Sequence, residues 1–110
     1  MPQRKLSADS ILRAAIAELR LVSFVLDGRQ RIAEPHDYGI KDGVAKLFFY
    51  QTGGESRSGK PIGWRWAALS KVSALKLLDQ RFPGPRRGSS DRHVKWDVLF
   101  ASVSSHLRSR

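Results

Sequence analysis

The sequence predicts a mainly β domain, a small five-stranded barrel with an α-helix at each end. Runs of β-branched and aromatic residues alternate with turn signals, among them Asp27-Gly28 and Asp42-Gly43. Apolar residues at helical spacing occur instead near both ends of the chain. A length of 110 residues, with 41% hydrophobic and 27% charged residues, suits one folded domain with a modest core.

The first expected helix spans about residues 8–20. Ser7 and Asp9 mark its start, because short polar side chains accept hydrogen bonds from the free amides of a first helical turn. The apolar positions that follow share a helical spacing and comprise Ile11, Leu12, Ala15, Ile16 and Leu19. This spacing predicts a helix with one buried face.

The five expected strands follow the helix and end before a Pro-Gly-Pro segment. Their ranges are about 21–26, 29–40, 44–51, 64–70 and 72–78. Pro35 interrupts the second run, and because proline cannot donate to a ladder it predicts an edge or a bulge. Short strands with tight turns are typical of small, curved barrels such as the SH3-like and OB-type folds.

Residues 83–110 are predicted to form a basic linker and a C-terminal amphipathic helix. The apolar stripe of that helix would consist of Trp96, Leu99, Phe100, Val103 and Leu107. Asp91 is a plausible cap. We expect the stripe to pack against the barrel or against a partner, since a lone helix of this length is marginal in water.

Charge favours an anionic partner. Twenty Lys and Arg against ten Asp and Glu give a net charge of +10, enough to attract polyanions or, in the alternative interpretation, simply to solubilise the surface. The chain has no cysteine, which excludes disulfides and thiolate zinc sites. It shows neither a secretory signal nor 18 consecutive apolar residues, so we expect a cytoplasmic protein without membrane contact.

Catalytic and metal sites are not expected. The three histidines, His36, His93 and His106, are scattered along the chain and lack the spacing of a zinc site. We interpret His36 as a hydrogen-bonding residue beside a bulged strand. A small nuclease or hydrolase relying on His36 is the less favoured alternative, and the prediction is a non-enzymatic protein without a cofactor.

The segment 52–63 is rich in glycine, serine and charge. Glycines let backbone amides converge on a phosphate, and Ser56, Arg57 and the nearby Arg65 could supply further donors. The alternative is a flexible hairpin tip. By alternation along its strand, Arg65 faces away from Trp64 and Trp66.

A second possible site lies on the third strand. Alternation places Lys46, Phe48 and Tyr50 on one face and Ala45, Leu47 and Phe49 on the other. A cation beside aromatic rings on a sheet is one way to hold single-stranded nucleic acid, although such rings more often fill the core of a small barrel. The basic tail could add phosphate contacts or be a solvated linker; its residues are Arg86, Arg87, Arg92, Lys95, Arg108 and Arg110.

The order of elements over residues 12–82 resembles the WYL domain family. The resemblance rests on the segments 31–36, 47–50, 65–72 and Phe82. It implies an SH3-like, Sm-like barrel over residues 1–82 that senses nucleotide-like or nucleic-acid ligands, as in many bacterial transcription regulators. Ala45 and Lys46 replace the name-giving Trp and Tyr, and Ser70-Lys71-Val72 replaces a later Asp-Arg-Ile.

The resemblance also carries individual residues. Arg31 and Pro35 match the family's basic residue and proline, Tyr50 its aromatic residue and Arg65 its arginine, while Lys71 retains only a charge. Only about ten residues precede the first helix, where such a regulator would carry a winged helix. We therefore expect a stand-alone domain, or one that works through a DNA-binding partner or a homo-oligomer.

Together these patterns predict a regulatory or sensor module for an anionic ligand, a nucleotide or a nucleic acid. Its expected site comprises Arg57, Arg65, Lys71, Tyr50, Ser56, Arg31 and Lys46. The alternative is a protein that binds single-stranded nucleic acid without sequence preference.

Overall fold

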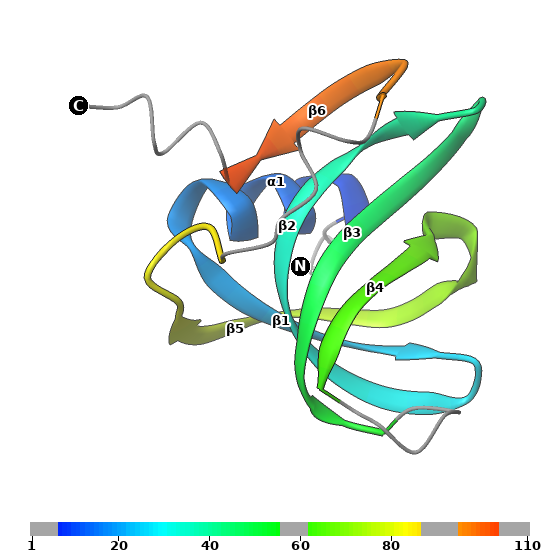
Figure 1. The fold of residues 1–110 in the computed structure, drawn as a ribbon. Helices are drawn as coiled ribbons and strands as arrows, with labels where there is room; N and C mark the ends of the chain where they lie inside the picture. Colours follow the sequence, from blue (N-terminus) through cyan, green and yellow to red (C-terminus); the bar gives the residue numbers. More distant parts are fainter. Residues whose placement is uncertain (1–6, 56–61, 87–94, 104–110) are drawn as a thin grey trace, which may run out of the picture.

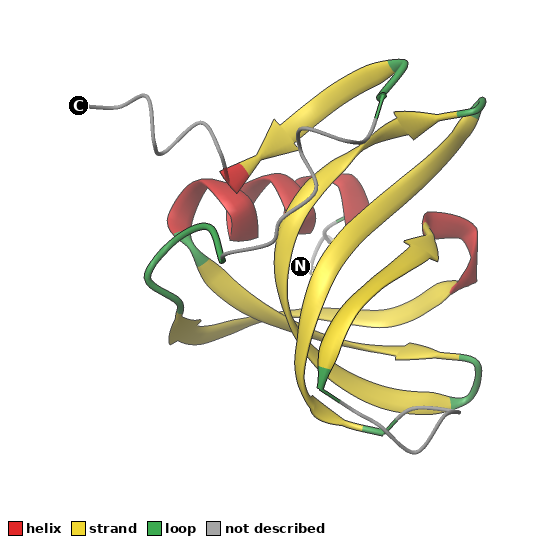
Figure 2. Ribbon diagram, viewed as in Figure 1, coloured by secondary structure: helices red, strands yellow, loops and turns green. Residues whose placement is uncertain are grey.

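The computed structural model describes residues 7–55, 62–86 and 95–103, which form one helix and a curved antiparallel sheet (Figures 1 and 2). The elements are α1 (Ala8–Glu18), β1 (Arg20–Leu26), β2 (Arg29–Lys41), β3 (Val44–Gly54), β4 (Gly63–Ala68), the 3-10 helix η1 (Leu69–Lys71), β5 (Val72–Arg81) and β6 (Val98–Ser102). No helix in the described ranges is long and apolar enough to cross a membrane.

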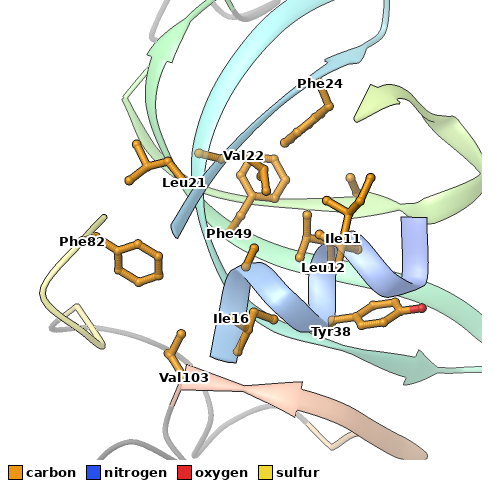
Figure 3. Packing of buried hydrophobic residues seen from close by; sticks show 14 of the residues in the cluster. Ile11, Leu12, Ile16, Leu21, Val22, Phe24, Tyr38, Phe49, Phe82 and Val103 are labelled. Atoms are coloured by element: carbon orange, nitrogen blue, oxygen red, sulfur yellow. The ribbon is translucent and has the colours of Figure 1, made fainter. Parts of the chain in front are cut away.

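Helix α1 forms where the sequence predicts it. The Ser7 side chain accepts a hydrogen bond from the Ser10 amide and caps the first turn. Leu19 adopts a left-handed conformation, with φ of 56°, and ends the helix. The apolar face of α1 packs on the sheet, as Figure 3 shows for Ile11, Leu12 and Ile16. The helix therefore closes over one end of the core.

The five predicted strands are all present and lie in the order β4-β3-β2-β1-β5. Two hairpins join β1 to β2 and β2 to β3, and the turn residues Asp27-Gly28 and Asp42-Gly43 all have positive φ. Positive φ at both central residues is the requirement of a tight type I′ turn, which explains the Asp-Gly signals.

The closed five-stranded barrel that the sequence predicts is not formed. The sheet is open and has six strands, because β6 adds to β2 beside the five expected strands. The edge strands β4 and β5 are joined through η1, and no ladder connects them in the described ranges. The backbone at Leu69–Lys71 turns as a 3-10 helix, so it does not extend either strand across the gap.

The expected C-terminal helix is also wrong for the described part of the segment. Val98–Ser102 forms β6 and pairs antiparallel with residues 37–40 of β2. Strand β1 pairs with β2 only as far as Ala33, so the rest of that β2 edge would otherwise leave its amides and carbonyls unpaired. This tertiary pairing outweighs the helical spacing of the apolar residues. Leu107 and Asp91 lie outside the described residues.

The change of partner along β2 occurs at the predicted irregularity. Pro35 lies between the stretch that pairs with β1 and the stretch that pairs with β6, where its missing amide costs no ladder bond on that edge. The β2–β3 register shifts between Pro35 and Asp37, so His36 occupies a bulge. Of the edge or bulge predicted at Pro35, the structure shows a bulge, at the neighbouring His36.

The two faces of the sheet differ in composition. We call the face that packs on α1 the inner face. It carries Phe24, Leu47 and Phe49, each fully buried, with Phe24 and Phe49 in edge-to-face contact at 5.2 Å. The opposite, outer face carries Phe48 and Lys46, as the alternation along β3 predicts.

Candidate ligand-binding site

The inner face ends in a basic cluster at the β1–β2 hairpin, remote from α1 (Figure 1). Arg31 pairs with Phe24 across the β1–β2 ladder, so its side chain enters the inner face. The residue is only 3% exposed. Its guanidinium donates to Gln51 Oε1 and to the Leu26 carbonyl, each at 3.3 Å. Arg31 Nε is buried without a hydrogen-bond partner in the described part of the chain.

Arg65 belongs to the same cluster. It pairs with the buried Phe49 across the β3–β4 ladder, which places it on the inner face, as alternation predicts. Burial lowers the pKa of Arg31, and the positive charge of Arg65 lowers it further. The nearest described carboxylate, that of Asp27, lies 4.0 Å from Arg31 and is 44% exposed. The cluster therefore holds two guanidinium groups that interact electrostatically, and the buried Arg31 has only the Asp27 carboxylate as an ion-pair partner in the described part of the chain.

Lys71 lies near this end of the sheet. It precedes Val72, which pairs with Leu26, the residue whose carbonyl accepts from Arg31. The Lys71 side chain is exposed on η1. Strand pairing thus brings Arg31 to the same region as Arg65 and Lys71, although Arg31 is far from the other two in sequence.

The other predicted site residues are not part of this cluster. Tyr50 and Lys46 lie on the outer face, because they alternate with the buried Leu47 and Phe49. Tyr50 therefore cannot orient an anion held by Arg65 through the same face of the sheet. Ser56 and Arg57 lie outside the described residues.

The outer face of β3 and β4 carries a row of contacting aromatic rings. Trp64 stacks on Phe48 with ring centroids 4.9 Å apart, and Trp66 packs on the other side at 4.7 Å. Tyr50 contacts Trp64 at 5.2 Å, and Trp96 contacts Trp66 at 5.5 Å. We call these five residues the outer aromatic row. Trp66 is its most exposed member, at 39%.

The segment after β5 packs against one end of this row through Arg86. The guanidinium of Arg86 forms two hydrogen bonds with the buried Glu34 carboxylate, at 2.6 and 3.0 Å. It also lies over the Tyr50 ring, 3.9 Å from its centroid. The hydrogen bonds that Arg86 donates to Glu34 raise the pKa of Arg86. The charge of Arg86 is thus already matched by Glu34.

His36 connects the bulge to the same segment. It is fully buried and stacks on Phe82 at 5.6 Å. The Arg86 amide donates to Nε2 at 3.2 Å, so the proton is on Nδ1, which donates to the Glu34 carbonyl at 2.9 Å. Burial lowers the pKa of His36, which keeps the ring neutral. Both ring nitrogens are occupied, and this arrangement fits the predicted hydrogen-bonding role.

Several residues of these sites escape sequence reasoning. Gln51 and Glu34 give no motif, because their roles arise from pairing with Arg31 and Arg86 across the fold. Trp96 joins the outer aromatic row instead of a helical stripe. In the described ranges, no three histidine, aspartate or glutamate side chains gather as metal ligands.

Comparison with protein-family models, curated protein sequences and solved structures finds no match. The relation to the WYL family therefore remains a prediction from the residues.

Proposed function

We propose that this chain is a non-enzymatic binding module for an anionic ligand of the nucleotide or nucleic-acid class. The observation that carries the proposal is the buried Arg31 beside Arg65 at one end of the inner face. A buried cation is costly unless negative charge compensates it, and the Asp27 carboxylate is 4.0 Å away and half-exposed. A phosphate or carboxylate bound between the two guanidinium groups would supply that charge.

The chemistry of arginine supports this assignment. A guanidinium presents a planar fork that pairs with two oxygens of a phosphate at once. Lys71, exposed on η1 near this end, adds a further cation. The wider relation to SH3-like WYL sensors and a role in regulation belong to the same proposal. A nuclease relying on His36 has less support, because that ring is buried and both nitrogens are engaged.

A binding assay on Arg65→Lys tests the proposal. The substitution keeps the charge but removes the two-pronged geometry, so affinity for a bound mononucleotide should fall at least about tenfold, or ~1.4 kcal/mol. Thermal shifts with inorganic phosphate, a mononucleotide and a cyclic dinucleotide identify the ligand, because binding to the native state raises its stability. Arg81→Lys, on the exposed end of β5, is the matched control.

The salt dependence separates a compact site from a polyanion surface. A single nucleotide held by two or three cations should lose affinity only gently as salt rises, whereas binding across many phosphates weakens steeply. Full mononucleotide affinity in Arg65→Ala at the same ionic strength would remove the Arg31–Arg65 cluster from the site.

A further inference from the structure

The outer aromatic row lies outside the hydrophobic core cluster and is partly exposed to water. All three tryptophans of the chain, Trp64, Trp66 and Trp96, lie in it. The hydrophobic core cluster contains none of them: it consists of residues of α1 and the inner sheet face with Phe82 and Val103 (Figure 3). Large rings on the other face, with Trp66 exposed by 39%, form an apolar surface that water covers in the free protein.

The rings are already held in place. Phe48 is 5% exposed and packs between Trp64 and Trp66, with an interplanar angle of 5° to Trp64 and 40° to Trp66. Trp96, which precedes β6, packs against Trp66 with an interplanar angle of 38°. A ligand that stacks on Trp66 would therefore immobilise few additional side chains, which lowers the entropic cost of binding.

The charge around the row favours an anionic polymer. Lys46 lies on the same face, two residues before Phe48, and forms no ion pair with another described residue. Lys95, next to Trp96, is exposed, as is Asp97 on the other side of Trp96, whose carboxylate accepts a hydrogen bond from the Gly43 amide. The carboxylate of Glu34 at the other end is neutralised by Arg86, and the chain as a whole carries +10. Rings that offer π-faces with cations beside them suit bases and phosphates respectively.

We propose that the outer aromatic row is a stacking surface for the unpaired bases of single-stranded nucleic acid, with Trp66 as its principal contact. The bases stack on the exposed indole, and Lys46 and Lys95 contact the phosphates. One face of the Tyr50 ring is covered by Arg86, so the surface runs from Trp64 to Trp96. This surface does not depend on the Arg31–Arg65 cluster, because the two lie on opposite faces of the sheet.

Tryptophan fluorescence tests the proposal directly, since every tryptophan of the chain reports on this surface. The probe is an oligothymidylate of about 10 nucleotides, within the ~4–16 nucleotides that one small single-strand-binding domain covers. It should quench the fluorescence of the full chain. An abasic strand of equal length has the same phosphates but no bases, and it should bind at least about fivefold more weakly. A duplex of the same length, whose bases are already stacked, should not compete at equal concentration.

Variants assign the effect to the row. Trp66→Ala should reduce affinity for the oligothymidylate at least about fivefold without changing the salt slope, and Trp66→Phe should restore most of it, because a ring remains. Val98→Ala is the matched control: this residue is 50% exposed and pairs with Ile40, on the other face of the sheet. It should bind as the unchanged protein does. Melting curves show that each variant is folded.

Three results would overturn the proposal. They are equal affinity of the abasic and normal strands, equal binding of duplex, and full affinity in folded Trp66→Ala. Arg65→Lys separates this surface from the anion site: it should weaken mononucleotide binding while leaving quenching by the oligothymidylate unchanged. Loss of quenching in Arg65→Lys but not in Trp66→Ala would place the strand at the Arg31–Arg65 cluster instead.

Discussion

The two faces of β3 and β4 are built from alternate residues of the same strands, yet they differ in composition and in exposure to water. The inner face carries the fully buried Leu47 and Phe49 and, towards one end, the cationic Arg65. The outer face carries rings that contact one another while Trp66 remains 39% exposed. Because strand residues alternate between faces, one short stretch of sequence can serve a sealed core and an accessible surface independently.

The largest expected difference between the faces is in stability. Phe49→Ala should lower the free energy of unfolding by about 3–5 kcal/mol, because it leaves a cavity in a core that cannot collapse fully. Trp66→Ala should cost only about 1–2 kcal/mol, the worth of one or two aromatic contacts. Urea denaturation at one pH measures both. Equal losses would mean that the outer row is as much part of the core as Phe49.

A loss of stability of intermediate size is expected from a substitution at Gly39, where β2 pairs with β6. A Cβ added at Gly39 would lie 2.2 Å from the Val98 carbonyl oxygen and 3.0 Å from the Trp96 ring. Gly39→Ala should therefore displace β6 and cost about 1–3 kcal/mol. In this variant, amide hydrogen exchange should speed up in Val98–Ser102 relative to the unchanged protein, and by more than it does in β1 or β5.

Gly53 provides the control for that substitution. It is also a β-strand glycine without positive φ, but an added Cβ would meet only the Ile32 side chain, at 3.7 Å or more. Gly53→Ala should leave both stability and exchange in β6 nearly unchanged. Protection of β6 that survives Gly39→Ala would show that this strand can shift without losing its pairing.

The smallest expected effect is a pH dependence that reports on His36. Its pKa is lowered in the folded protein, so the unfolded chain binds more protons just below the ordinary histidine pKa of about 6.5. The contribution of His36 to the free energy of unfolding should be fully present above that value and be lost as the pH falls through it. The total loss is about 1.4 kcal/mol for each pH unit by which folding lowers the pKa of His36. Thermal melts across pH 5–8 measure the slope, with ~6.5 as the pH at which the loss begins.

His36→Gln isolates this contribution. Glutamine cannot take up a proton in this range, so the slope between the variant and the unchanged protein should differ by the His36 term alone. An identical slope in both proteins would assign the pH dependence to other groups and would leave no role for His36 as a neutral acceptor of the Arg86 amide.

Much of the fold could be predicted from local patterns. The helix cap at Ser7, the two Asp-Gly turns and the five strand ranges depend on the preferences of neighbouring residues, and all are confirmed within a few positions. The bulge at Pro35 is likewise local, because it follows from a missing amide. Alternation also predicts that Arg65 faces away from Trp64 and Trp66, as the structure shows.

The candidate sites were predictable only in part. Arg31 and Arg65 were both selected, but the burial of Arg31 and its bond to Gln51 depend on the ladder between β2 and β3. The family resemblance assigns Tyr50 to the anion site, whereas its face of the sheet puts it beside Trp64 and under Arg86.

The sequence by itself determined α1, the two tight hairpins and the strands β1 to β5, because these follow from caps, turns and periodicity over a few residues. The tertiary structure decided that the sheet stays open and that Val98–Ser102 becomes a strand. The physical reason is that unpaired backbone amides and carbonyls on the free edge of β2 are stabilised by hydrogen bonds to another strand. That edge exists only once the rest of the sheet has formed. Local spacing of apolar residues cannot encode it.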